Sequence, residues 1–131
     1  MKIEKFEDIQ SWQEAKELTN LVYEICKKSI FSKDFGLRDQ IQRASVSIMA
    51  NIAEGFDSQS DIEFIRFLNY SRRSASEVQS HLYVALEQKY INNDDFYKMY
   101  NKCKETKRLI GGFIKYLKRP RTQDLGLRTK G

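Results

Sequence analysis

Apolar residues recur in steps of three and four along four stretches of this chain of 131 residues. Such spacing gathers the apolar side chains on one face of a helix, and it predicts four amphipathic helices. The predicted helices span residues 11–29, 37–54, 61–89 and 94–119. Because no segment alternates apolar and polar residues with a period of two, the sequence predicts an all-α fold without strands.

Local sequence signals mark where these helices begin and end. Ser11 and Ser60 each precede a glutamate by three positions, which is the spacing of a capping box at a helix N-terminus. The Asn-Asn-Asp-Asp run at residues 92–95 predicts another cap. Gly55 is expected to end the second helix in the left-handed conformation, and Pro120 excludes further helix after the fourth.

The connections between the predicted helices are short compared with the helices themselves. Short links make consecutive helices antiparallel neighbours, so we expect an up-and-down antiparallel four-helix bundle with left-handed packing. The bundle domain is expected to comprise residues 1–119. Residues 120–131 are polar and unpatterned, and we expect them to form a flexible basic tail.

The cysteines and the distribution of apolar residues indicate the cellular compartment of the protein. Cys26 and Cys103 lie far apart within helical patterns, which favours buried free thiols in a reducing cytosol. The N-terminal ten residues lack the apolar core of a signal peptide, and no apolar run has the length of a membrane span. We therefore expect a soluble cytoplasmic protein with no membrane partner.

Positive charge is concentrated near the C-terminus. Residues 102–131 contain ten Lys or Arg against two Asp or Glu, whereas the preceding residues carry 13 basic and 16 acidic side chains. A local cationic field attracts polyanions, so we expect a nucleic acid, either RNA or DNA, to bind the last helix. The candidate contacts are Lys104, Lys107, Arg108, Lys115, Lys118, Arg119 and Arg121, joined by Arg72 and Arg73 of the third predicted helix.

The sequence holds no evident catalytic or metal-binding group. His81 is the only histidine, and although Glu77 lies four residues before it, di-metal sites in helical bundles need histidines and carboxylates from several helices. Arg73 and His81 are separated by about 12 Å along a helix axis, too far to act together on one phosphate. With no activated nucleophile and no phosphate-binding glycine loop, we expect neither a cofactor nor enzymatic activity.

Three residues are unusual for helix interiors. Asn51 falls in the apolar seam of the second helix, where we expect its amide to bond a neighbouring backbone or side chain and fix register. Gly111 and Gly112 each weaken the last helix by about 1 kcal/mol relative to alanine. This pair indicates either a bend or a close helix contact.

The aromatic residues exceed what four buried seams need, so some must face outward. Exposed rings among lysines and arginines can stack on nucleobases. In helical bundles such rings more often line subunit interfaces, which is the interpretation we favour while both stay open. The residues in question are Phe64, Phe67, Tyr70, Tyr83, Tyr90, Phe96, Tyr97, Tyr100, Phe113 and Tyr116.

Several short motifs in the second and third predicted helices point to a family. They are Gly36-Leu37, the Gln-Ile-Gln-Arg-Ala-Ser-Val-Ser-Ile run at residues 40–48, Asn-Ile-Ala-Glu-Gly at residues 51–55, and Phe67-Leu68. With these the chain resembles the four-helix bundle family named for the 23S rRNA-intervening-sequence protein, over about residues 6–118. The resemblance implies a homo-oligomer, a pentameric ring of bundles, with no established enzymatic activity. The family is also similar to the accessory proteins of diversity-generating retroelements, which are basic bundles that bind nucleic acid and a reverse transcriptase.

Two hypotheses about function follow. The first is a non-catalytic oligomeric protein that binds nucleic acid through the basic surface of its last helix. The alternative is a protein-interaction scaffold or adaptor with a protein partner and no direct nucleic-acid contact. An enzyme is the least supported of the function classes.

Overall fold

The computed structural model describes residues 3–120, and within this range the chain is helical without strands. This confirms the all-α prediction. The elements are η1 (Phe6–Asp8), a short 3-10 helix, followed by the α helices α1 (Gln10–Cys26), α2 (Ser29–Ser32), α3 (Phe35–Asp57), α4 (Asp61–Glu87) and α5 (Asn93–Leu117).

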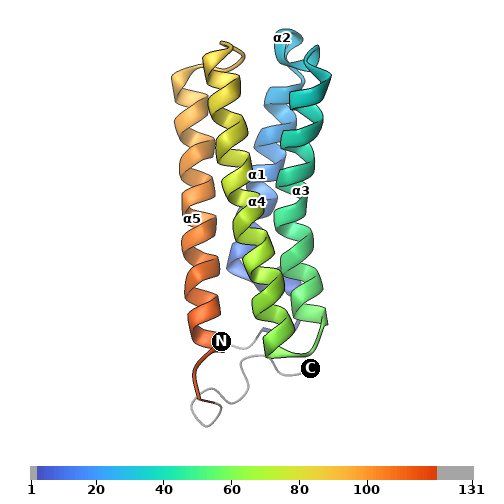
Figure 1. Cartoon of the computed structure of the whole chain (residues 1–131), viewed down its shortest axis with the longest axis vertical. Helices are drawn as coiled ribbons and strands as arrows, with labels where there is room; N and C mark the ends of the chain where they lie inside the picture. The colour runs from blue at the N-terminus through green and yellow to red at the C-terminus, as the bar shows by residue number, and fades with distance from the viewer. Residues whose placement is uncertain (1–2, 121–131) are drawn as a thin grey trace.

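The four long helices lie side by side along the long axis of the molecule, with α2 at the end where α1 leads into α3 (Figure 1). The α3–α4 link lies at the opposite end from the α1–α3 and α4–α5 links. Helix α3 packs against α1 and α4, and α5 packs against the same two helices. Every long helix sends a fully buried apolar side chain into the shared core, as Leu18, Ile48, Leu68 and Ile110 illustrate.

Two of the predicted N-terminal caps are confirmed. The Ser60 hydroxyl accepts a hydrogen bond of 3.3 Å from the Glu63 amide at the start of α4. The Asn92 side chain accepts one of 2.7 Å from the Asp95 amide at the start of α5. Each bond satisfies an amide that has no partner within its own helix.

The capping box predicted at Ser11 is wrong. Helix α1 begins at Gln10, its N-cap is Ile9, and no side chain caps it. Ile9 is 2% exposed, and burying its side chain in the core places the helix start before the serine. Ser11 thus lies inside the first turn, and its buried hydroxyl has no hydrogen-bond partner among the described residues.

The first predicted helix is also too long. Helix α1 ends at Cys26 and not at residue 29, and a separate short helix, α2, follows at Ser29–Ser32. The break places the Phe31 side chain, which has no exposed surface, over the end of the core. Its ring centroid lies 5.2 Å from that of Tyr90, so an aromatic contact closes this end.

Gly55 does not end its helix, contrary to prediction. Helix α3 continues to Asp57, and the left-handed residue is Gln59, with φ 64°. The glycine instead allows α4 to approach closely, since a Cβ atom at this position would lie 2.8 Å from Phe64 Cδ1 and 2.9 Å from Phe67 Cβ.

Asn51 makes the neighbouring hydrogen bonds that were expected. Its amide nitrogen donates to the Ser47 carbonyl at 2.9 Å and to the Ser47 hydroxyl at 3.0 Å. The Ser74 hydroxyl of α4 donates to the same Ser47 oxygen at 3.0 Å, and the Ser71 hydroxyl donates to the Ile48 carbonyl at 2.8 Å. Small polar side chains therefore join α3 to α4 where the two helices pack closely.

Both cysteines are buried free thiols, as predicted. Burial raises the pKa of Cys26 to about 11 and that of Cys103 to about 12. Thiols with such values are poor nucleophiles at neutral pH. Across residues 3–120, none of the helices has both the length and the apolar character needed to span a membrane.

Candidate nucleic-acid interface

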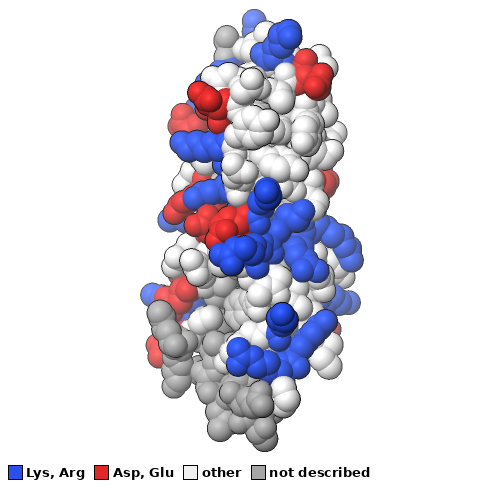
Figure 2. Space-filling model, turned by 90° about the vertical axis from the view of Figure 1, so that its left-hand side faces the viewer, with Lys and Arg blue, Asp and Glu red and all other residues white. Residues whose placement is uncertain are grey.

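A groove between α4 and α5 gathers cationic side chains from both helices. It consists of two adjoining hollows of about 620 and 310 Å³ that share Arg72 and Lys107 in their linings. Figure 2 faces this side of the molecule and shows Lys and Arg spread over its middle and lower part. We call this feature the cationic groove, and its charged lining is Arg72, Arg73, Lys107, Arg108, Lys115 and Lys118.

Helical spacing places these residues along one seam. On α4, Asn69, Arg72 and Ser76 recur in steps of three and four and therefore share a face. On α5, Lys107, Gly111 and Lys115 recur in steps of four, and Lys118 follows three positions later. The charge of the groove thus comes from two consecutive helices, α4 and α5, that pack against each other.

Gly111 makes room for the Arg72 side chain. A Cβ atom at Gly111 would lie 3.3 Å from Arg72 Nη1, which is tighter than ordinary packing, whereas one at Gly112 would meet nothing within 4 Å. Helix α5 continues through both glycines. Of the two explanations that the sequence allowed, the structure supports a close contact at Gly111.

Five of the six charged groove residues are available to a ligand. Arg72 donates to Asn69 Oδ1 at 3.1 Å, and Lys107 donates to Gln79 Oε1 at 3.1 Å, so both have neutral partners. Within residues 3–120, these two side chains and those of Arg73, Lys115 and Lys118 form no ion pair. No carboxylate among the described residues therefore offsets their charge.

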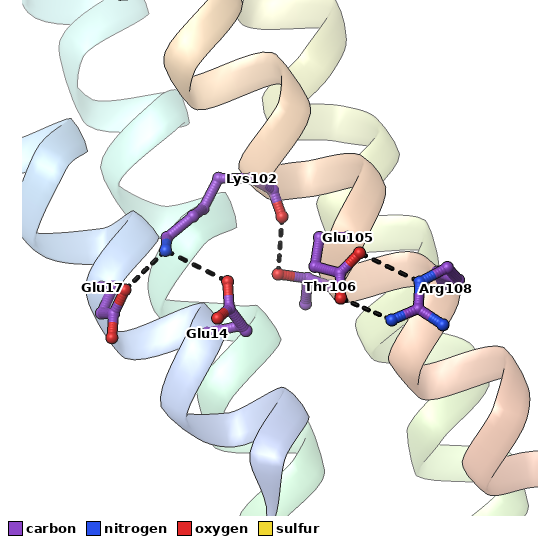
Figure 3. Close-up of polar contacts among 6 residues, drawn as sticks. All are labelled: Glu14, Glu17, Lys102, Glu105, Thr106 and Arg108. Carbon is purple, nitrogen blue, oxygen red and sulfur yellow. Dashed lines mark hydrogen bonds and ion pairs between the residues drawn. The ribbon is translucent and has the colours of Figure 1, made fainter.

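Arg108 is the groove residue that is paired. Its guanidinium donates to both carboxylate oxygens of Glu105, over 3.0 and 2.6 Å (Figure 3). The hydrogen bond to Arg108 lowers the pKa of Glu105, and that bond in turn raises the pKa of Arg108. Glu105 thus offsets much of the charge that the sequence assigns to Arg108.

Lys102 belongs to the basic segment but turns away from the groove. Its ammonium lies 3.1 Å from Glu14 Oε1 and 2.5 Å from Glu17 Oε1, both on α1 (Figure 3). The hydrogen bond to Glu17 is the main cause that raises the pKa of Lys102, and the same bond lowers that of Glu17. This lysine joins α1 to α5 and does not add to the groove's charge.

Two further predicted contacts, Lys104 and Arg119, lie outside the groove lining. Lys104 is exposed on α5, and the Arg119 guanidinium lies 4.1 Å from the centroid of the Tyr116 ring at the end of that helix. Arg121 lies outside the described residues. Six of the nine residues predicted from sequence therefore line one groove.

The sequence interpretation missed the neutral members of the lining, among them Asn69, Ser76 and Gly111. Asn69 and Ser76 lie three or four positions from Arg72 and Arg73, so the helical period alone could have identified them. Gly111 depends on the packing of α4 against α5, which no local signal reveals.

His81 does not line the groove. It is half-buried on α4, and its Nε2 atom has no hydrogen-bond partner among the described residues. No three His, Cys, Asp or Glu side chains in residues 3–120 are grouped as a metal site would require.

The fold and this surface define a small all-helical protein with a cationic groove on one side. A sequence profile of the 23S rRNA-intervening sequence protein family matches residues 7–112, which is most of the chain. The chain therefore belongs to this family.

A solved structure is similar to this one. It is the 1.70 Å crystal structure of a protein of unknown function from the S23 ribosomal protein family of Bacteroides thetaiotaomicron. The TM-score is 0.74 and the sequence identity 27%, and the match covers 80% of this chain and 95% of the other. A comparison with curated proteins found no match.

Proposed function

We propose that this protein binds nucleic acid, without catalysis, through the cationic groove. The observation that carries the proposal is the set of five groove cations that form no ion pair within the described residues. Phosphate oxygens accept hydrogen bonds from Lys and Arg, and releasing condensed counterions from the nucleic acid favours binding. Such contacts position a strand and carry little sequence information.

The proposal includes a cytoplasmic homo-oligomer, which the family resemblance favours as a pentamer. Each subunit is proposed to be an up-and-down four-helix bundle with left-handed packing, and the alternating ends at which the links lie support this order (Figure 1). In a ring the groove would be presented several times. Modest contacts at each groove would then add up to a higher avidity.

The first ligand to test is RNA. The family description refers to an intervening sequence of 23S rRNA, which favours RNA over DNA as the starting probe. DNA of the same sequence and length shows whether the sugar contributes to affinity. A groove that contacts only phosphates should bind RNA and DNA with similar affinity.

The test is a titration of labelled RNA and DNA, followed by fluorescence anisotropy at several salt concentrations. If all five unpaired groove cations contact phosphates, log affinity should fall against log salt with a slope of roughly 3.5 on single strands and roughly 4.5 on duplex DNA. No salt-dependent binding to either nucleic acid would refute the proposal.

A charge reversal locates the binding surface. The double variant Lys115→Glu with Lys118→Glu changes two exposed groove cations and should greatly weaken binding. The matched control is Lys16→Glu with Lys33→Glu, which alters net charge equally at exposed positions that do not line the groove. Equal losses in the two variants would show that only overall charge matters, against the proposal.

The alternative, a protein-interaction scaffold, has one observation in its favour. Ile30, Phe35 and Ile62 are 56%, 64% and 80% exposed, and none lines the cationic groove. Exposed apolar side chains that form a contiguous patch mark contacts with other proteins, whereas single ones are common on monomers. A stoichiometric protein partner recovered after nuclease treatment, together with no binding of labelled nucleic acid, would favour this alternative.

A further inference from the structure

A cluster of aromatic rings lies on the same α4–α5 face as the cationic groove. Tyr83 of α4 packs against Phe96 and Tyr100 of α5, with centroid separations of 4.9 and 5.7 Å, and Tyr97 lies 5.2 Å from Phe96. Phe96 is only 2% exposed, whereas Tyr83 and Tyr97 are 50% and 59% exposed. We call the three tyrosines around Phe96 the aromatic platform.

The platform continues the line of the groove. On α5, Tyr100 precedes Lys104 by four positions and Lys107 by seven, so the three share a face and span about 10 Å of helix. On α4, Tyr83 lies four positions after Gln79, which accepts the hydrogen bond from Lys107. Figure 2 shows a broad uncharged area above the band of Lys and Arg on this side of the molecule.

Contacts within the aromatic platform restrict the conformations of its rings. Phe96 anchors the cluster from the core, and the Tyr83 and Tyr100 rings meet edge to face, with their planes at 77°. Rings fixed by such contacts lose little conformational freedom when a flat partner stacks on them. The exposed faces of Tyr83 and Tyr97 therefore suit a planar, aromatic group.

We infer that the groove and the platform together bind single-stranded nucleic acid, with phosphates in the cationic groove and bases stacked on Tyr97 and Tyr83. This inference rests on the proposed function. Duplexes hide their base faces within the stack, whereas a single strand offers phosphates and bare bases along one chain. The aromatic platform can stack on the bases of such a strand, and the adjoining cationic groove can bind its phosphates.

The decisive variant is Tyr97→Ala, measured with a labelled 12-nucleotide oligouridine. Losing one stacked base should lower affinity about 5- to 150-fold. The slope of log affinity against log salt should stay the same, because no phosphate contact is removed. Tyr97→Phe retains the ring and should bind like the wild type.

Three controls separate stacking from other effects. Tyr23→Ala removes a tyrosine that is 41% exposed on α1, and it should leave affinity unchanged. An abasic oligomer of the same length and a duplex should each bind Tyr97→Ala and the wild type equally. Circular dichroism and light scattering on the full chain should show the same helicity and mass for both proteins.

Other results would distinguish a failure of the proposed function from a failure of the stacking inference. If the wild type binds neither RNA nor DNA, the proposed function fails and this inference with it. If the groove charge reversal weakens single-strand binding while Tyr97→Ala does not, the proposed function stands and the stacking inference is wrong. A lower mass for Tyr97→Ala, or equal losses on duplex and single strand, would also overturn the inference, because the platform would then serve assembly or folding.

Discussion

Gly55 of α3 lies so close to Phe64 of α4 that a Cβ atom on the glycine would stand 2.8 Å from Phe64 Cδ1. Side-chain carbons do not approach one another so closely, so only glycine fits this position without a shift of the neighbour. The contact lies where α3 continues through residue 55 toward its end at Asp57. A residue that is costly inside a helix thus allows two helices to meet closely here.

Replacing Gly55 by alanine should destabilise the protein. Overpacking of a filled contact costs about 1–3 kcal/mol. With neighbours at 2.8 and 2.9 Å we expect the upper part of this range, which exceeds the gain of about 1 kcal/mol from the better helix propensity of alanine. The free energy of unfolding from urea denaturation, followed by circular dichroism, measures the net effect. Gly112→Ala is the matched control, because a Cβ atom there meets nothing within 4 Å and should stabilise the protein. Equal effects of the two substitutions would show that packing at Gly55 does not limit stability.

The sequence predicts those features of the fold that depend on nearby residues. Ser60 and Asn92 cap α4 and α5 because each side chain reaches an amide three positions away. Ser11 has the same local pattern but is not the cap, since the N-cap is the buried Ile9, two residues earlier. The role of Gly55 could not be predicted either, because Phe64 approaches it only in the folded state.

In the candidate site too, the sequence predicts what depends on neighbouring residues and misses what depends on contacts between helices. Helical spacing could predict that Lys107 and Lys115 share a face, and charge counts could predict that this face is cationic. That Lys102 pairs with Glu14 depends on α1 packing against α5, over 80 positions apart in sequence. Because opposite charges on distant helices cancel only after packing, sequence reasoning overestimates the free charge of α5.

Acid should weaken the protein through the ion pair of Lys102 and Glu17. The hydrogen bond to Lys102 lowers the pKa of Glu17 from its ordinary value of 4.5. The ion pair therefore stabilises the fold above pH 4.5, and this stabilisation is lost as the pH falls through the lowered pKa of Glu17. Lys102→Met should reduce stability at neutral pH and flatten the decline in stability below about pH 4.5. Thermal melting temperatures measured across this pH range check both effects.

The control for that experiment is Lys104→Met. Lys104 is exposed on the same helix, and it forms no ion pair within residues 3–120. Its removal should leave the acid dependence of the melting temperature unchanged. If Lys102→Met and Lys104→Met gave the same pH profile, the ion pair of Lys102 and Glu17 would not contribute to the acid dependence of stability.

Cys26 and Cys103 should report on unfolding, because neither reacts readily in the folded protein. Thiolates are the reactive species, and with a pKa of about 11 only about 0.1% of Cys26 is ionised at pH 8. Burial of both side chains, with 2% and no exposed surface, also keeps a reagent away from the sulfur atoms. A chromogenic disulfide reagent should therefore modify neither thiol quickly under native conditions and both after denaturation.

Between these limits the modification rate should rise with urea in parallel with the unfolded fraction from circular dichroism. Fast modification of either thiol without denaturant would instead place that cysteine at a surface or in a locally open segment.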